Sequence, residues 1–246
     1  MPYPHLRRAP ISEALIDIQV DLPDGSERDL LDGFCQAIED RYPIKKEQHE
    51  FSGQFKMEIE QSQPTATASK RFSGYLLTSQ DGLEVAQGRL DGFTYSRLCP
   101  YQSWEELQEE AKRVWEVYID CLRPILIKRI AVRYINKIVI PVGSDLRDYL
   151  ATNFDIAQNL PQSIADFLLR IVIPFPDEGC SAIITQTFDH ASEKDQMPLI
   201  FDIDVFQVGE PSIASATLWE QLGRLRSVKN RIFFESIEDK VIEEFK

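Results

Sequence analysis

Paired acidic residues are the first feature of the chain that could support chemistry. Glu58 and Glu60 alternate with apolar residues, as do Asp202 and Asp204, so each pair projects from one face of an expected β-strand. Carboxylates arranged in this way can bind Mg²⁺ or another hard cation. The same alternation also arises on the solvent face of any amphipathic strand, and this plainer interpretation is the favoured one.

A basic strand face is the second such feature. Between residues 129 and 140, Arg129, Arg133 and Lys137 occupy one side of an expected strand, and mostly apolar residues occupy the other. A strand near the N-terminus shows Asp17 and Asp21 opposite an apolar face. If these two strands are neighbours, acid meets base across them, and cross-strand ion pairs account for both sets.

The alternative is an anion-binding groove. In that hypothesis the basic strand residues join cationic and amide side chains further along the chain, because arginine suits both phosphate and carboxylate. The expected ligand- or partner-binding residues are Arg129, Arg133, Asn136, Lys137, Arg226, Lys229 and Asn230. Asn136 stands among apolar neighbours, so we expect its amide to bind backbone, Tyr134 or Asn230.

Other signatures of function are missing from the sequence. The histidines are not paired at metal-ligand spacing, the four cysteines show no C-x-x-C, and there is no phosphate-binding glycine loop. The sequence therefore predicts no cofactor and no catalytic residue. A net charge of -13 makes nucleic acid an improbable partner, and we expect a cytoplasmic protein without a membrane segment.

Two similar halves must position these residues. Each half begins with an alternating strand followed by a Gly-containing turn at Gly25 or Gly143, and each ends with a helix that starts near Trp104 or Trp219. Ser103 and Thr217 each stand three residues before a glutamate, the spacing of a helix-capping box.

The predicted fold class is α+β. Two β-α-β-β-β-α repeats would form a mostly antiparallel sheet with helices packed on one face. Residues 1–123 would make the first repeat, and residues 124–246 the second repeat with a C-terminal helix. The two repeats are expected either as separate units or as one fused domain.

The chain also resembles a sporadically distributed prokaryotic family of about this length that has no established activity. The resemblance rests on Ala9-Pro10 with Glu13-Ala14, on Arg133-Tyr134-x-Asn136, and on Lys229-Asn230-x-x-Phe233. The sporadic distribution of this family implies a gene that travels with mobile or defence modules, such as a toxin–antitoxin pair. The resemblance supplies no catalytic residues.

Three functions follow as hypotheses. The leading one is a non-catalytic protein that binds a partner, such as a small basic protein or a second copy, as an antitoxin-like or accessory component. The second is a metal-dependent enzyme that uses the four carboxylates named above and acts on an anionic ligand. The third is a sensor that binds a nucleotide or another small anion without turnover.

Overall fold

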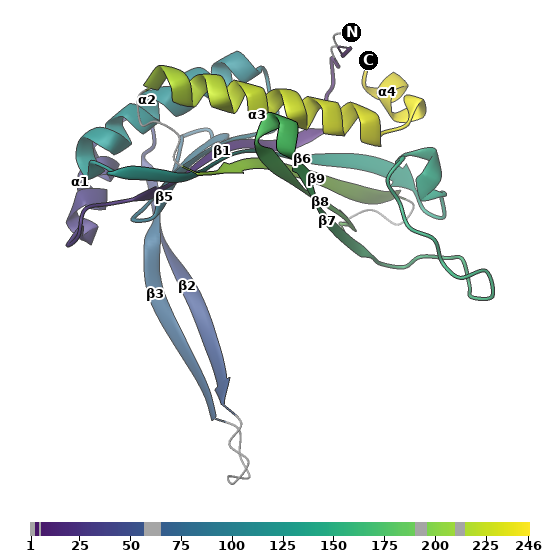
Figure 1. Ribbon diagram of the computed structural model, residues 1–246, viewed down its shortest axis with the longest axis horizontal. Helices are drawn as coiled ribbons and strands as arrows, with labels where there is room; N and C mark the ends of the chain where they lie inside the picture. Colours follow the sequence, from purple (N-terminus) through teal and green to yellow (C-terminus); the bar gives the residue numbers. More distant parts are fainter. Residues whose placement is uncertain (1–2, 5, 57–64, 190–195, 210–214) are drawn as a thin grey trace.

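The structure is a computed structural model of the whole chain, and it describes all residues except 1–2, 5, 57–64, 190–195 and 210–214. It is an α+β protein in which a large antiparallel sheet carries helices (Figure 1). The described strands are β1 (Ile11–Asp21), β2 (Ile44–Lys56), β3 (Thr65–Thr78), β4 (Glu84–Arg89), β5 (Gly92–Leu98), β6 (Leu126–Pro141), β7 (Leu168–Phe175), β8 (Cys180–Phe188) and β9 (Gln196–Val208). The described helices are α1 (Arg28–Ala37), α2 (Trp104–Leu122), α3 (Ser215–Ser236) and α4 (Asp239–Phe245).

The sheet runs without interruption across both halves of the chain. Its strand order is β2-β3-β4-β5-β1-β6-β9-β8-β7, with β1 and β6 paired at the centre. Each central strand is flanked by the last strand of its own half, β5 beside β1 and β9 beside β6. One cluster of buried apolar residues spans the boundary at residue 123.

Alternation along the central strands decides which face is buried. Ala14, Ile16, Ile18 and Val20 of β1 are buried, while the residues between them are half-buried. Successive strand residues point to opposite faces, so one face of the sheet is apolar and the other is polar. Helices α2 and α3 lie across the apolar face (Figure 1). We call the opposite side the open face.

The element order departs from the two expected β-α-β-β-β-α units. Residues 84–98 form two strands instead of one, because β4 and β5 make a hairpin with its turn before Gly92. Gly92 permits the close approach of β5 to β1, because a Cβ there would lie 2.6 Å from the carbonyl oxygen of Ile18. The helix expected after β6 is replaced by a short 3₁₀ turn at Leu146–Asp148.

One of the two expected helix caps is formed. The Ser103 hydroxyl accepts a hydrogen bond from the Glu106 amide at 3.1 Å, which caps α2. Thr217 lies inside α3, which begins at Ser215, so the prediction of a cap at Thr217 is wrong. Within the described residues, no helix is long and apolar enough to cross a membrane.

Candidate functional site

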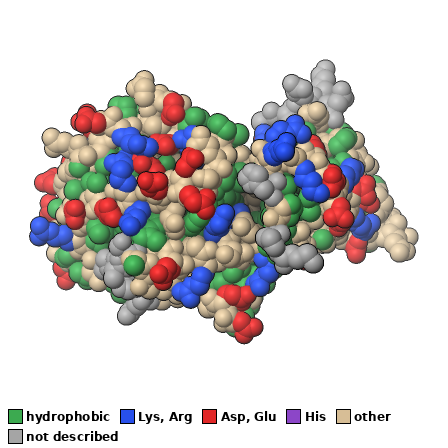
Figure 2. Space-filling view, turned by 90° about the horizontal axis from the view of Figure 1, so that it is seen from above, with side chains coloured by type: hydrophobic (Ala, Val, Ile, Leu, Met, Phe, Trp, Pro, Cys, Tyr) green, Lys and Arg blue, Asp and Glu red, His purple; other side chains and the backbone are tan. Residues whose placement is uncertain are grey.

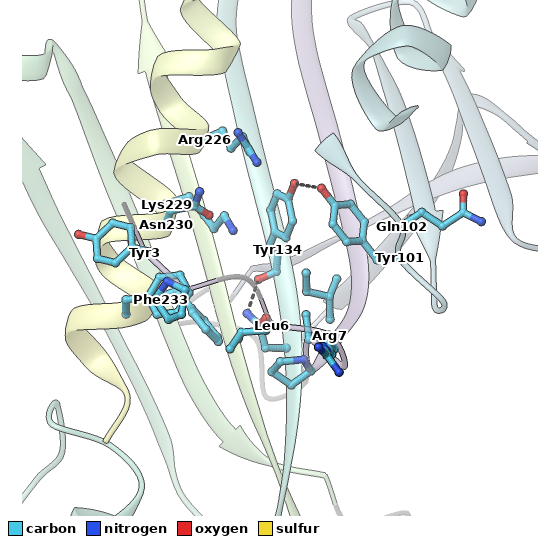
Figure 3. A pocket seen from close by; sticks show the side chains of 16 residues that line it. Tyr3, Leu6, Arg7, Tyr101, Gln102, Tyr134, Arg226, Lys229, Asn230 and Phe233 are labelled. Atoms are coloured by element: carbon cyan, nitrogen blue, oxygen red, sulfur yellow. Dashed lines mark hydrogen bonds between the residues drawn. The ribbon is translucent and has the colours of Figure 1, made fainter. Parts of the chain in front are cut away.

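A pocket lies between α3, β6 and the N-terminal segment (Figure 3). Its volume is about 340 Å³, and it is open to solvent on one side. The described residues that line it are Tyr3, Pro4, Leu6, Arg7, Ala9, Pro10, Ile11, Tyr101, Gln102, Tyr134, Asn136, Arg226, Lys229, Asn230, Phe233 and Phe234. We call this the α3 pocket.

Helical and strand periodicity bring these side chains together. Arg226, Lys229, Asn230 and Phe233 are three or four residues apart on α3, so they share one face of the helix. Tyr134 and Asn136 belong to the positions of β6 that face the helices. Tyr101 comes from the loop before α2, and its ring packs edge-on against that of Tyr134.

Lys229 is the central residue of the α3 pocket. Its side chain extends from α3 toward β6 (Figure 3), and only 7% of the residue is exposed. Its Nζ lies 3.7 Å from the centre of the Tyr134 ring, a cation–π contact. It makes no ion pair or hydrogen bond with any residue that the structure describes.

Burial and the neighbouring charge of Arg226 lower the pKa of Lys229 to about 7. An ammonium group loses its hydration when it is buried, and no carboxylate of a described residue forms an ion pair that would compensate for that loss here. Arg226 stands one helical turn earlier, with its guanidinium 5.5 Å from the centre of the Trp104 ring. About half of the Lys229 side chains are therefore neutral amines at neutral pH.

Two phenols stand beside this amine. The hydroxyls of Tyr101 and Tyr134 are 2.8 Å apart and share a hydrogen bond. Burial raises the pKa of Tyr101 to about 12 and also raises the pKa of Tyr134. Both phenols therefore stay protonated near neutral pH and supply a polar group without negative charge.

Asn136 fixes the backbone at one wall of the pocket. Its Nδ2 donates to the carbonyl oxygen of Phe201 at 2.9 Å and to that of Tyr134 at 3.4 Å. The residue is only 2% exposed. The expectation that its amide binds backbone is confirmed.

The charge of the α3 pocket is opposite to that of the whole chain. Among the described lining residues there are three cations, Arg7, Arg226 and Lys229, and no aspartate or glutamate. None of these three side chains has an ion pair with a described residue. In contrast, acidic and basic side chains intermix over the molecular surface in Figure 2. The α3 pocket thus offers cationic donors without competing carboxylates.

The basic residues of β6 lie on the other side of the sheet. Arg133 forms two hydrogen bonds with Asp202, at 2.9 and 2.7 Å. Arg129 contacts Asp17 and Asp204 at 3.2 and 2.7 Å. The strands β1 and β6 are neighbours, so the expected pairing of acid with base across them is confirmed for Arg129.

The structure therefore divides the expected binding residues into two groups. Asn136, Arg226, Lys229 and Asn230 line the α3 pocket. The basic residues of β6 are on the open face, where Lys137 contacts Asp189 at 2.8 Å. A single groove that contains both groups is not formed.

The structure describes two of the four carboxylates considered as alternative metal ligands. Glu58 and Glu60 lie outside the described residues. Asp202 and Asp204 are each bound to an arginine, and burial raises the pKa of Asp204 despite Arg129. No group of three or more metal-binding side chains occurs in the part of the chain that the structure describes.

Sequence analysis missed two contributors to the pocket, Arg7 and Tyr101. Both come from irregular segments, so no periodicity placed them. Lys229 carried a detectable signal, because it continues the apolar stripe of α3 after Leu222 and Leu225. A lysine at a core position of a helix is rarely buried unless it is paired with an anion or binds a ligand.

Comparison with known proteins adds no relative: no protein-family model matches the chain, and no curated protein matches it.

Proposed function

We propose that the chain is a sensor that binds a small anionic ligand in the α3 pocket. The observation that carries this proposal is the buried Lys229 beside Arg226, which has no ion pair or hydrogen bond with a described residue and lies in a cavity with no described carboxylate. The cost of burying these cations is offset when an anion enters and accepts hydrogen bonds from them. A cavity of about 340 Å³ suits a small organic anion.

The segments that carry the family resemblance support the same site. Ala9-Pro10 forms part of the rim, Tyr134 and Asn136 form the floor, and α3 contributes the third segment. These stretches are far apart in the sequence and each contributes to this pocket, although Glu13 and Arg133 of the same stretches do not line it. Binding at this pocket would therefore be a property of the resembled family as well.

Calorimetry and thermal unfolding with acetate, inorganic phosphate and adenosine monophosphate test the proposal. A ligand at 100 times its Kd stabilises the folded state by about 2.7 kcal/mol. Loss of a hydrogen bond between charged groups costs about 1.5 to 3 kcal/mol, so Arg226→Gln should weaken binding about tenfold or more. Arg224→Gln is the matched control, because Arg224 is exposed on the same helix and does not line the pocket.

Equal affinities of the two variants would contradict the proposal, as would the absence of binding for every anion tested. Retained affinity in Lys229→Met would equally contradict the role of the buried amine.

A second candidate function uses the open face, and we propose it for a protein partner. Leu168 and Val172 of the edge strand β7 are 73% and 53% exposed. Val172 is paired with Ile183, which in turn opposes Asp204, so these apolar residues share the open face with the ion pairs of β6. The sheet arches over this side (Figure 1), which leaves room for a partner. An antitoxin-like or accessory role in a defence module belongs to this candidate.

Native co-purification tests the second candidate. The double variant Leu168→Asp with Val172→Asp should release the partner, whereas Val142→Asp, at a similarly exposed apolar residue of another segment, should retain it. Recovery of the chain alone from its native host would contradict the proposal.

We also propose that the two halves are copies of one unit and that the protein is cytoplasmic. The matched flanking of β1 by β5 and of β6 by β9 supports the first proposal. The four cysteines are free thiols, which supports a reducing compartment.

A further inference from the structure

We propose that Lys229 captures anionic carbonyl compounds of the α-oxo acid class as an imine inside the α3 pocket. The inference rests on the proposed function, because it states which anions the pocket takes and how it holds them. It adds a covalent step that anion binding alone does not require.

The geometry around the amine supports this step. Lys229 lines an open cavity, so a small carbonyl compound can reach its Nζ. No described carboxylate or carbonyl holds the amine in another direction. A lysine that is desolvated beside another cation is an activated nucleophile, and Arg226 is that cation here.

The pocket also matches the remainder of such a compound. The carboxylate of an α-oxo acid can pair with Arg226, which leaves the adjacent carbonyl carbon facing the amine. The rings of Tyr134 and Phe233 give the pocket an aromatic wall beside this position. Charge and shape thus favour a carbonyl group next to an anion over a neutral aldehyde.

The reaction is balanced without any further reagent. The neutral amine nitrogen attacks the carbonyl carbon, and a proton moves from nitrogen to oxygen to give a carbinolamine. A proton from the phenol pair then joins the hydroxyl, and water leaves as the nitrogen lone pair forms the C=N bond of an iminium ion. Loss of the remaining N–H proton returns the proton to the phenol pair, so the net products are the imine and one water. The hydroxyl pair of Tyr101 and Tyr134, 2.8 Å apart, can relay these protons.

Reductive trapping of the full-length protein tests the inference. The protein is incubated with glyoxylate and sodium cyanoborohydride near neutral pH, and peptides are mapped by mass spectrometry. At about pH 7 roughly half of Lys229 is neutral, against about one in 3,000 of lysines with an ordinary pKa of 10.5. The larger neutral fraction favours Lys229, but a weaker base is also a weaker nucleophile, which offsets part of that advantage. We therefore expect carboxymethylation of Lys229 to be at least about tenfold faster than that of Lys137.

Lys137 is the internal control because it is ion-paired with Asp189 on the open face. Lys137→Met should leave the rapid labelling intact, and Lys229→Met should abolish it while circular dichroism shows the same fold. Labelling of Lys229 at the rate of Lys137 would overturn the inference.

Competing ligands separate this inference from the proposed function. Acetate, which has no reactive carbonyl, should slow the labelling of Lys229 by occupying the same pocket. If acetate binds but glyoxylate does not label Lys229, the imine is refuted and anion binding stands. If propanal labels Lys229 as fast as glyoxylate and acetate has no effect, the reactive amine stands and the anion site is refuted.

Discussion

The stability of the protein should depend on pH through Lys229, and Lys229→Met isolates this dependence. The folded-state pKa of about 7 is lower than the ordinary value of 10.5 that applies to the unfolded chain. Folding therefore disfavours the charged form of this side chain. The resulting loss of stability is complete below about pH 7 and is relieved as the pH rises from about 7 toward 10.5.

The magnitude follows from the pKa difference. Each pKa unit is worth about 1.4 kcal/mol, so the full cost of charging Lys229 in the folded state is about 5 kcal/mol. Between about pH 7 and pH 9 the unfolded chain keeps its proton on this lysine, whereas the folded chain passes from half to almost fully neutral. Over this interval the wild type should gain about 2 kcal/mol that the variant does not gain.

Urea unfolding of both proteins at these two pH values measures this gain. Other titrating groups, including the nearby Tyr101, Tyr134, Arg226 and Glu105, are common to both proteins and largely cancel in the difference. The stability of Lys229→Met relative to the wild type should fall by about 2 kcal/mol on going from the lower to the higher pH. A difference independent of pH would refute the reasoning.

Four further results are expected. Ser103→Ala should cost about 1 kcal/mol in urea unfolding by removing the cap of α2, whereas Thr217→Ala, inside α3, should change stability by less than about 0.5 kcal/mol. Asn136→Leu should cost about 1 to 3 kcal/mol, because two buried carbonyl groups lose their donor. Arg129→Met should destabilise the protein by about 3 kcal/mol in the same assay, because it leaves the largely buried carboxylate of Asp204 without its ion-pair partner, whereas Asp17 keeps Arg89. Acetate binding at about pH 8 should take up nearly one proton, because the anion raises the pKa of Lys229, and calorimetry in buffers of different ionisation enthalpy should detect it. Heats that do not vary with the buffer would contradict this last result.

Much of the sheet could be predicted because its central strands are strongly amphipathic. The alternation in β1 and β6 predicted their buried faces, and their complementary charges were explained on the condition that the two strands are neighbours, which they are. The hairpin within residues 84–98 was missed although the alternation changes phase there: the buried positions are Ala86 and Gly88 in β4 but Phe93 and Tyr95 in β5, on either side of the turn before Gly92. The cap at Thr217 failed because the spacing of a capping box also occurs inside a helix.

The candidate site was predicted in part, and strand geometry explains the error. Arg133 and Asn136 are separated by three positions on β6, and residues an odd number of positions apart point to opposite faces. The sequence therefore already implied that they cannot share one groove. What it could not show is that Lys229 has no ion pair with any described residue, because this depends on how irregular segments near Arg7 and Tyr101 meet α3.

The contrast between the two faces of the sheet is the strongest reason to assign function to the α3 pocket. On the open face each arginine of β6 is bound to an aspartate of a neighbouring strand, so the fold already uses those charges. In the α3 pocket Lys229 and Arg226 are close to each other, and no described carboxylate forms an ion pair with either of them. This is so even though acidic residues outnumber basic ones in the chain. The chain has 40 acidic residues, and a carboxylate beside Lys229 would offset part of the free energy of unfolding that is lost by burying this lysine. The uncompensated charge is therefore best explained by a ligand that supplies the missing anion.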